Sequence, residues 1–189
     1  MARRASGSNQ YRTRAARALD DQWPDGLRPT HRFDGPAAAW IAADYKQEAA
    51  RLAKKSTSSN VEIRLEVARD VRAPHRVLLR LARDPDPRVR TRVASHPGAT
   101  AQVLGRLVND PDTSVLYNVA RHPECTPAML ARLATCAEWE IRQMVARHAQ
   151  CPPQTLVALA GDDHQRVRES SLNNPGLPEE YRVLGQVTR

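Results

Sequence analysis

The stretch RVRTRVASHPGATAQVLGRLVNDPDT, residues 88–113, is followed directly by SVLYNVARHPECTPAMLARLATCAEW, residues 114–139. When the two segments are aligned, they share apolar residues, a His-Pro step and a pair of leucines at the same places, so the chain repeats with a period of 26 residues. A fixed period of this length is the signature of an array of stacked helical units, and it constrains the fold before any secondary structure is assigned.

The period extends in both directions and defines five repeats, the last of them shortened: 62–87, 88–113, 114–139, 140–165 and 166–189. Position 2 of the repeat is always Ile or Val, and position 6 is Val until Ser171 replaces it. Position 7 is Ala in the first four repeats, where a methyl group allows stacked helices to approach closely. Two later positions hold Leu in the first four repeats, at a spacing that puts them on one helical face.

Proline and capping residues divide each repeat into two helices. The first helix is expected to end at steps such as His96-Pro97, because the residue before proline is pushed out of the α region. The second is expected to open at Thr100, or at Thr126 followed by Pro127, which fits an N-cap and a first-turn proline. Asp86 followed by Pro87 gives the same signal at the start of the next repeat.

One pair of short helices cannot bury its apolar face alone, so the repeats must stack into a solenoid. Ser171 and Arg182 replace apolar column residues of the fifth repeat, as expected of an end cap facing solvent. At the other end, residues 36–60 are expected to form an amphipathic capping helix over Pro36 to Lys55. Residues 1–35 are rich in arginine and are predicted to be a flexible basic tail.

Six of these repeated columns carry a family resemblance. The pattern formed by Val89-Arg90, Val93-Ala94, His96-Pro97, Leu104, Leu107 and Asp110 resembles the leucine-rich repeat variant family, and it covers residues 62–189. The resemblance implies an all-α, right-handed superhelical solenoid without strands, in which the second helix of each repeat is a short 3₁₀ or α helix. This sequence departs from the family in its longer repeat and in having mostly His-Pro where Asn-Pro is common. The iron–sulfur segment of the founding member is not carried over, because residues 1–61 contain no Cys.

Composition narrows the classes of function. The chain has 29 basic and 21 acidic residues, a net charge of +8 that favours acidic protein surfaces or polyanions as partners. Its three cysteines form no CxxC pair and are odd in number, so we expect no disulfide framework. A reducing, cytoplasmic location is expected instead. The chain also has no apolar run long enough to span a membrane.

The arginines of the first helices are the candidate partner-binding residues, because stacking turns each repeat position into a column. Position 3, beside the buried positions 2 and 6, holds Arg64, Arg90, Leu116, Arg142 and Arg168. Position 8 contributes Arg69, Arg121 and Arg147, and a second cluster of basic residues contains Arg72, Arg76, Arg80 and Arg83. Such columns could contact a phosphate backbone or an acidic peptide. They could equally form a solvated face paired with Glu62, Glu66, Asp86 and Glu169.

No feature of the sequence favours a cofactor or catalysis. His96, His122 and His148 share one column and Cys125 and Cys151 another, but equivalent residues of adjacent repeats lie too far apart to converge on a metal. The sequence contains no phosphate-binding glycine loop, HExxH or GxSxG motif. We therefore expect no metal, cofactor or small-molecule substrate. The prediction is a non-catalytic scaffold that binds a protein through an Arg-lined face, with a nucleic-acid binder, using the Arg columns and the basic tail, as the alternative.

Overall fold

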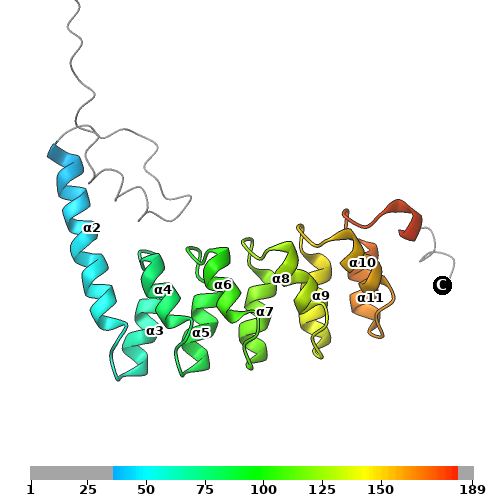
Figure 1. The fold of residues 1–189 in the computed structure, drawn as a ribbon, viewed down its shortest axis with the longest axis horizontal. Helices are drawn as coiled ribbons and strands as arrows, with labels where there is room; N and C mark the ends of the chain where they lie inside the picture. Colours follow the sequence, from blue (N-terminus) through cyan, green and yellow to red (C-terminus); the bar gives the residue numbers. More distant parts are fainter. Residues whose placement is uncertain (1–35, 183–189) are drawn as a thin grey trace, which may run out of the picture.

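A computed structural model of the chain describes residues 36–182, which are all-helical and contain no strand within that range. Ten helices follow one another in a row of stacked pairs (Figure 1). Their bounds are α2 Pro36–Lys55, α3 Val61–Arg69, α4 His75–Leu81, α5 Pro87–Ala94, α6 Ala101–Leu107, α7 Thr113–Arg121, α8 Pro127–Leu133, α9 Trp139–Arg147, α10 Pro153–Ala160 and α11 Gln165–Leu172. The predicted basic tail lies outside the described residues.

The helix starts follow the sequence period. The first helices of the repeats begin at Val61, Pro87, Thr113, Trp139 and Gln165, each 26 residues after the previous one. The second helices begin at His75, Ala101, Pro127 and Pro153 with the same interval. They are short α helices, so of the two forms expected for them, 3₁₀ and α, the structure contains the α form.

Capping residues fix these starts. Asp86 and Asp112 are the N-caps of α5 and α7, and each side chain accepts the backbone N–H of the residue two positions later. Thr126 caps α8 in the same way through Met129 N–H, ahead of a proline at the first helical position. Thr100 also stands at an N-cap, but its hydroxyl makes no capping hydrogen bond.

The core is a continuous band of small aliphatic side chains between the two layers of helices. The isoleucine and valine columns of α5, α7 and α9, the alanines beside them and the leucines of the second helices are buried. Each fully buried Val or Leu contributes about 1.5–3 kcal/mol of transfer free energy. Cys125 and Cys151 are buried at the position that holds Ala73 and Ala99 in the earlier repeats, as their place in the repeat predicts.

One prediction about the end of the array is wrong. Ser171 was expected to face solvent, yet its side chain is fully buried and its hydroxyl donates to the carbonyl of Leu156, 2.6 Å away. A buried hydroxyl is tolerated there because a backbone carbonyl of α10 supplies an acceptor. Arg182 is half-buried and donates to the carbonyls of Asn174 and Pro175.

The helix α2 lies at the N-terminal end of the row and contacts α3 (Figure 1). Leu52 near its C-terminus is buried in the common core. Within residues 36–182, no helix combines the length and the apolar composition that crossing a bilayer requires.

Candidate interaction surfaces

The position-3 arginines join the repeats to one another. The Nε and Nη2 atoms of three of them donate to both oxygens of the Asp at position 23 of the same repeat: Arg64 to Asp84 at 2.6 and 2.9 Å, Arg90 to Asp110 at 2.7 and 2.9 Å, and Arg142 to Asp162 at 2.7 and 3.0 Å. These are two-pronged, charge-assisted contacts, the strong class of protein hydrogen bond. The side chains are largely buried, with 12–16% of each arginine and 3–7% of each aspartate exposed.

The remaining nitrogen of each guanidinium reaches the preceding connection. Nη1 of Arg90 donates to the carbonyls of Asp84 and Pro85, 2.8 and 3.1 Å away, so one side chain joins two successive connections. Arg64, Arg142 and Arg168 make the equivalent pair of carbonyl contacts. We call this arrangement of Arg, Asp and two carbonyls the arginine clamp.

The third repeat lacks both charged members of the clamp. Leu116 stands at position 3 and Cys136 at position 23, and both pack against the hydrophobic core as half-buried residues. The two substitutions occur together because a buried aspartate without its arginine would be an unpaired charge. This paired replacement within one chain indicates that the clamp is a structural unit.

The clamp contains the position-3 arginines, the column that the sequence analysis put first among the candidate partner-binding residues. Hydrogen bonding to Arg142 lowers the pKa of the Asp162 carboxyl, and hydrogen bonding to Asp84, Asp110 or Asp162 raises the pKa of its arginine. The expected pairing with Glu62, Glu66 or Glu169 is not what holds these groups; the partners are the aspartates at the ends of the second helices. Partner binding by Arg64, Arg90, Arg142 and Arg168 stays a prediction, and their contacts within the chain do not favour it.

The histidine column is also part of the scaffold. Nδ1 of His96 accepts the N–H of Gly98, and its Nε2 lies 2.9 Å from the carbonyl of Asp70 in the preceding repeat. His122 and His148 repeat this pattern, and Asn174 takes the same place in the fifth repeat. Since each imidazole binds backbone groups on both sides, the column links successive repeats. Within residues 36–182, no three His, Cys, Asp or Glu side chains are placed to hold a metal.

The buried thiols are poorly suited to reaction. Burial raises the pKa of both the Cys125 and the Cys151 thiol to about 11. Thiolate, not thiol, is the nucleophile and the metal ligand. The chemistry of these residues is therefore that of small apolar side chains.

The position-8 arginines differ from those at position 3. Arg69, Arg121 and Arg147 are exposed on the side of the array formed by α3, α5, α7, α9 and α11, which we call the first-helix face. The Arg121 guanidinium lies 5.7 Å from the ring centre of Tyr117, and the side chains of Arg69 and Arg147 form no hydrogen bond or ion pair with any residue of 36–182. Arg92 of α5 is exposed on the same face.

The second basic cluster divides into two kinds of residue. Arg72 is paired with Asp70 and Glu48, and is thus partly neutralised. Arg76 and Arg80 are exposed on α4, and Arg80 donates to Ser56 and to the carbonyl of Ala53 in α2. The sequence reasoning missed Arg106 and Arg132, which occupy the position of Arg80 in the next two repeats and are exposed. The same 26-residue period would have found them.

Three shallow depressions follow one another along the first-helix face. The first, of about 480 Å³, spans α3, α5 and α7; the second, of about 410 Å³, lies between α7 and α9; the third, of about 550 Å³, lies between α9 and α11. Arg92, Arg121 and Arg147 each line one or two of them.

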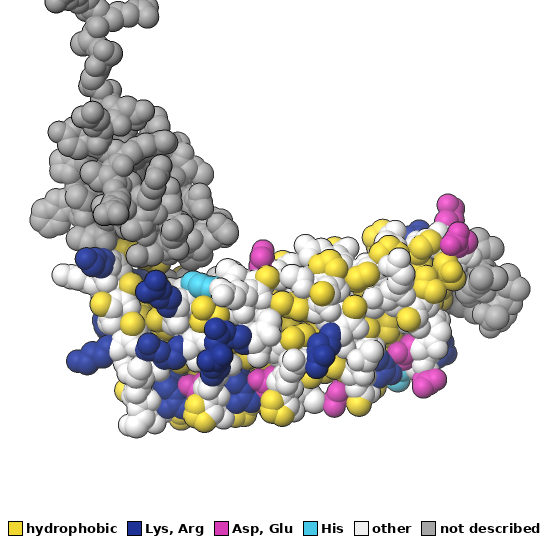
Figure 2. All heavy atoms as spheres, in the orientation of Figure 1, with side chains coloured by type: hydrophobic (Ala, Val, Ile, Leu, Met, Phe, Trp, Pro, Cys, Tyr) yellow, Lys and Arg dark blue, Asp and Glu magenta, His cyan; other side chains and the backbone are white. Residues whose placement is uncertain are grey.

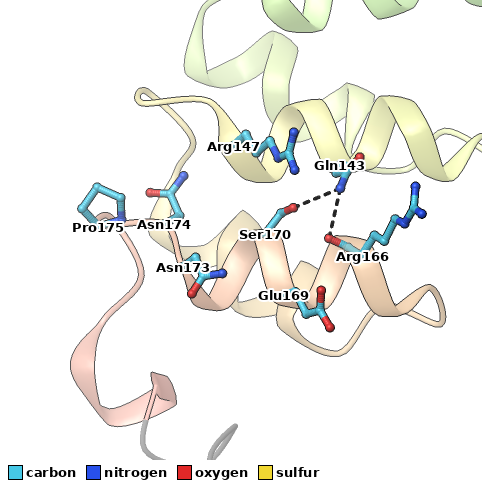
Figure 3. Close-up of a pocket in the computed structure, with 8 residues that line it drawn as sticks. All are labelled: Gln143, Arg147, Arg166, Glu169, Ser170, Asn173, Asn174 and Pro175. Atoms are coloured by element: carbon cyan, nitrogen blue, oxygen red, sulfur yellow. Dashed lines mark hydrogen bonds between the residues drawn. The ribbon is translucent and has the colours of Figure 1, made fainter.

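The third depression is polar (Figure 3). Gln143 of α9 lines it and donates to the Ser170 hydroxyl and the Arg166 carbonyl of α11, 3.3 and 3.5 Å away. Arg147 stands on the α9 side of the depression, and Arg166 extends from α11 with its guanidinium 5.5 Å from the ring centre of Trp139. The Trp139 ring itself stacks on His164 at 4.0 Å. These stacked rings hold Arg166 at the rim.

Comparison with known families agrees with the geometry. The model of the leucine rich repeat variant family matches residues 139–164, a segment as long as one repeat, which begins where α9 begins. The resemblance found in the sequence is thereby confirmed for residues 139–164, which form one repeat of that family. No curated protein matches the chain at a significant level.

Proposed function

We propose that this array of leucine rich repeat variant units is a non-catalytic scaffold that binds an extended, acidic segment of a partner protein along its first-helix face. The observation that carries the proposal is the row of depressions between successive first helices, whose lining includes Arg92, Arg121 and Arg147, exposed arginines that form no ion pair with a carboxylate of residues 36–182. Solenoids commonly bind partners along such an extended face.

Amide side chains in the depressions suit a peptide backbone. Asn118 uses its Nδ2 on the Ser114 carbonyl, and Gln143 uses its Nε2 on α11, so the amide oxygens of both remain open as acceptors. A peptide offers one N–H per residue to such acceptors. Arginine prefers the planar carboxylate of Asp or Glu side chains.

The spacing of the helices suggests a periodic ligand. Packed helices lie about 8–10 Å apart, so Arg92, Arg121 and Arg147 on α5, α7 and α9 are separated by roughly that distance per step. An extended chain rises about 3.3 Å per residue. An acidic side chain at about every third residue of the ligand would therefore meet successive arginines.

The mixed charge of this face supports a protein partner over a nucleic acid. Glu62 and Glu169 line the first and third depressions beside the arginines. A continuous phosphate backbone would meet these carboxylates as well. A peptide can place basic or neutral residues opposite them.

Selection from a random peptide library displayed on phage tests this proposal with the full chain. We expect enriched peptides to carry Asp or Glu at intervals of about three residues. The triple variant Arg92→Gln, Arg121→Gln, Arg147→Gln should lose their binding. The matched control Arg76→Gln, Arg106→Gln, Arg132→Gln removes the same charge from α4, α6 and α8 and should keep it. Enrichment of peptides without acidic residues, or equal loss in both variants, would contradict the proposal.

A further inference from the structure

The exposed side of the second helices carries a basic strip of its own. Five arginines on this side are exposed: Arg76 and Arg80 of α4, Arg83 two residues after its end, Arg106 of α6 and Arg132 of α8. We call these five residues the outer arginine strip. Arg80, Arg106 and Arg132 share one repeat position, and Arg76, Arg80 and Arg83 follow a helical spacing of four and three.

The strip is not balanced by carboxylates on its own helices. The sequences of α4, α6 and α8 contain no Asp or Glu. Asp84 and Asp110, at the ends of α4 and α6, are buried or half-buried and held by Arg64 and Arg90 of the clamp. Along the sequence, the exposed acidic residue nearest to α8 is Glu124, three residues before the helix begins. The nearby carboxylates of Asp84 and Asp110 are thus paired within the clamp, and the outer arginine strip keeps its positive charge.

The strip is confined to one part of the array. In the fourth repeat Ala158 takes the position of Arg132, and α10 has no charged residue. Figure 2 accordingly shows Lys and Arg side chains gathered mainly over α2 to α6, with fewer towards α9 and α11. Such a local concentration of charge acts over a short range at physiological salt, where the Debye length is about 8 Å.

We propose that the outer arginine strip binds the phosphate backbone of a duplex nucleic acid. Guanidinium groups bind phosphate in two-pronged geometry. Two repeat steps of about 8–10 Å would let Arg80, Arg106 and Arg132 track a backbone over roughly 20 Å. The side chains of Arg76, Arg83 and Arg106 make no hydrogen bond or ion pair with the rest of residues 36–182, so their guanidinium donors are open.

The surroundings of the strip select this ligand among polyanions. The helices α4, α6 and α8 contain no Phe, Tyr or Trp, whereas binding of single strands relies on stacking of bases on aromatic rings. The large apolar side chains that are exposed within the described part of the chain are Val71 and Tyr181, and neither is on these helices. A membrane-binding surface would pair its basic residues with exposed apolar ones.

This surface goes beyond the proposed function, because it belongs to the other layer of helices. A scaffold with both surfaces could hold a protein segment on the first-helix face and a duplex on the second-helix face at the same time. The two proposals can fail separately, since each triple variant described above removes arginines from only one of the faces.

The test is binding of the full chain to a labelled mixed-sequence duplex at about 50 and 200 mM salt. The probe set also includes the matching single strand and phosphatidylcholine vesicles containing phosphatidylserine. Each phosphate contact contributes about 0.9 to the slope of log affinity against log salt. The variant Arg76→Gln, Arg106→Gln, Arg132→Gln is therefore expected to lose about 2.7 from the slope, which makes the fall in duplex affinity over this salt range about 40-fold smaller.

The first-helix variant Arg92→Gln, Arg121→Gln, Arg147→Gln has the same net charge and should keep the wild-type slope. Equal slopes in the two variants would overturn the proposal, because binding would then follow net charge and not the strip. The proposal is also overturned if the outer variant binds the duplex as tightly as the wild type. Loss of binding to the single strand or the vesicles, with no loss for the duplex, would assign the strip to that other ligand.

Discussion

The arginine clamp leads to a prediction about the stability of the fold when one of its charged members is replaced. The third repeat, which lacks both charged members, bears on this prediction. Replacing Asp110 with Ala removes three hydrogen bonds, from Arg90 Nε, Arg90 Nη2 and the Asp112 N–H. The guanidinium is left with only 13% of its side chain exposed and no counter-ion.

The size of the loss follows from burial. Breaking one partner out of a buried ion pair costs about 3–5 kcal/mol. The lower end, about 3 kcal/mol, applies here because Nη1 of Arg90 keeps its two carbonyl acceptors. For a protein of this size, about 2–4 °C of midpoint is lost per kcal/mol, so the unfolding midpoint should fall by roughly 6–12 °C. Arg90→Leu should cost a similar amount, since it leaves the Asp110 carboxylate buried with only the Asp112 N–H as donor.

The double variant Arg90→Leu, Asp110→Cys copies the third repeat, where Leu116 and Cys136 occupy these positions. It removes both charges together and should be no less stable than either single variant. Scanning calorimetry of the wild type, Arg90→Leu, Asp110→Cys and the double variant in reducing buffer gives the coupling energy, which we expect to be about 3 kcal/mol. If the two losses simply add, to about 6 kcal/mol, the clamp is not the energetic unit inferred from its geometry.

Two further predictions concern titratable groups. Burial lowers the pKa of His96, so its imidazole is neutral in both the folded and the unfolded chain above about pH 6.5. Stability should fall as the pH drops below that value, because the unfolded chain then takes up a proton that the folded chain does not. His96→Asn places there the residue that already serves as Asn174, and unfolding midpoints between pH 7 and 5 should decline less steeply than in the wild type; an unchanged decline would contradict this. The Cys125 and Cys151 thiols, with a pKa of about 11, should react with iodoacetamide at pH 8 far more slowly in the folded protein than in urea, as mass spectrometry of their peptides would show. Similar rates in the two states would mean that these sites open readily.

The 26-residue period, together with the proline and capping residues, was sufficient to predict the helices and the core. Asp86-Pro87 and Thr126-Pro127 define helix starts by local chemistry alone, because a cap and a first-turn proline act within a few residues. The apolar columns were found for a similar reason, since burial in a stack follows helical spacing. The prediction that Ser171 faces solvent was wrong because its hydrogen-bond acceptor, the Leu156 carbonyl, lies in the preceding helix, and helical spacing does not reveal it.

The sequence could not rank the arginine columns in the same way. Positions 3 and 8 both read as polar flanks of one helix, and what separates Arg90 from Arg121 is a carboxylate 20 residues farther along the chain. Local spacing carries no information on such a contact. The joint change to Leu116 and Cys136 in the third repeat was the available signal, because it links two distant positions through one event.

Arginine is suited to the clamp in a way that lysine is not. The planar guanidinium presents donors on two edges, so Arg90 can bind a carboxylate on one edge and two carbonyls on the other, whereas an ammonium is a single point of charge. Every basic residue from position 61 onward is Arg, and part of that preference therefore belongs to the scaffold. The number of arginines in turn overstates the basic groups open to partners, because each clamp pairs one arginine with an aspartate inside the array. The positions that vary without disturbing the clamp, such as those of Arg121 on the first helices and Arg106 on the second, are where the repeat can acquire a binding surface without losing its fold.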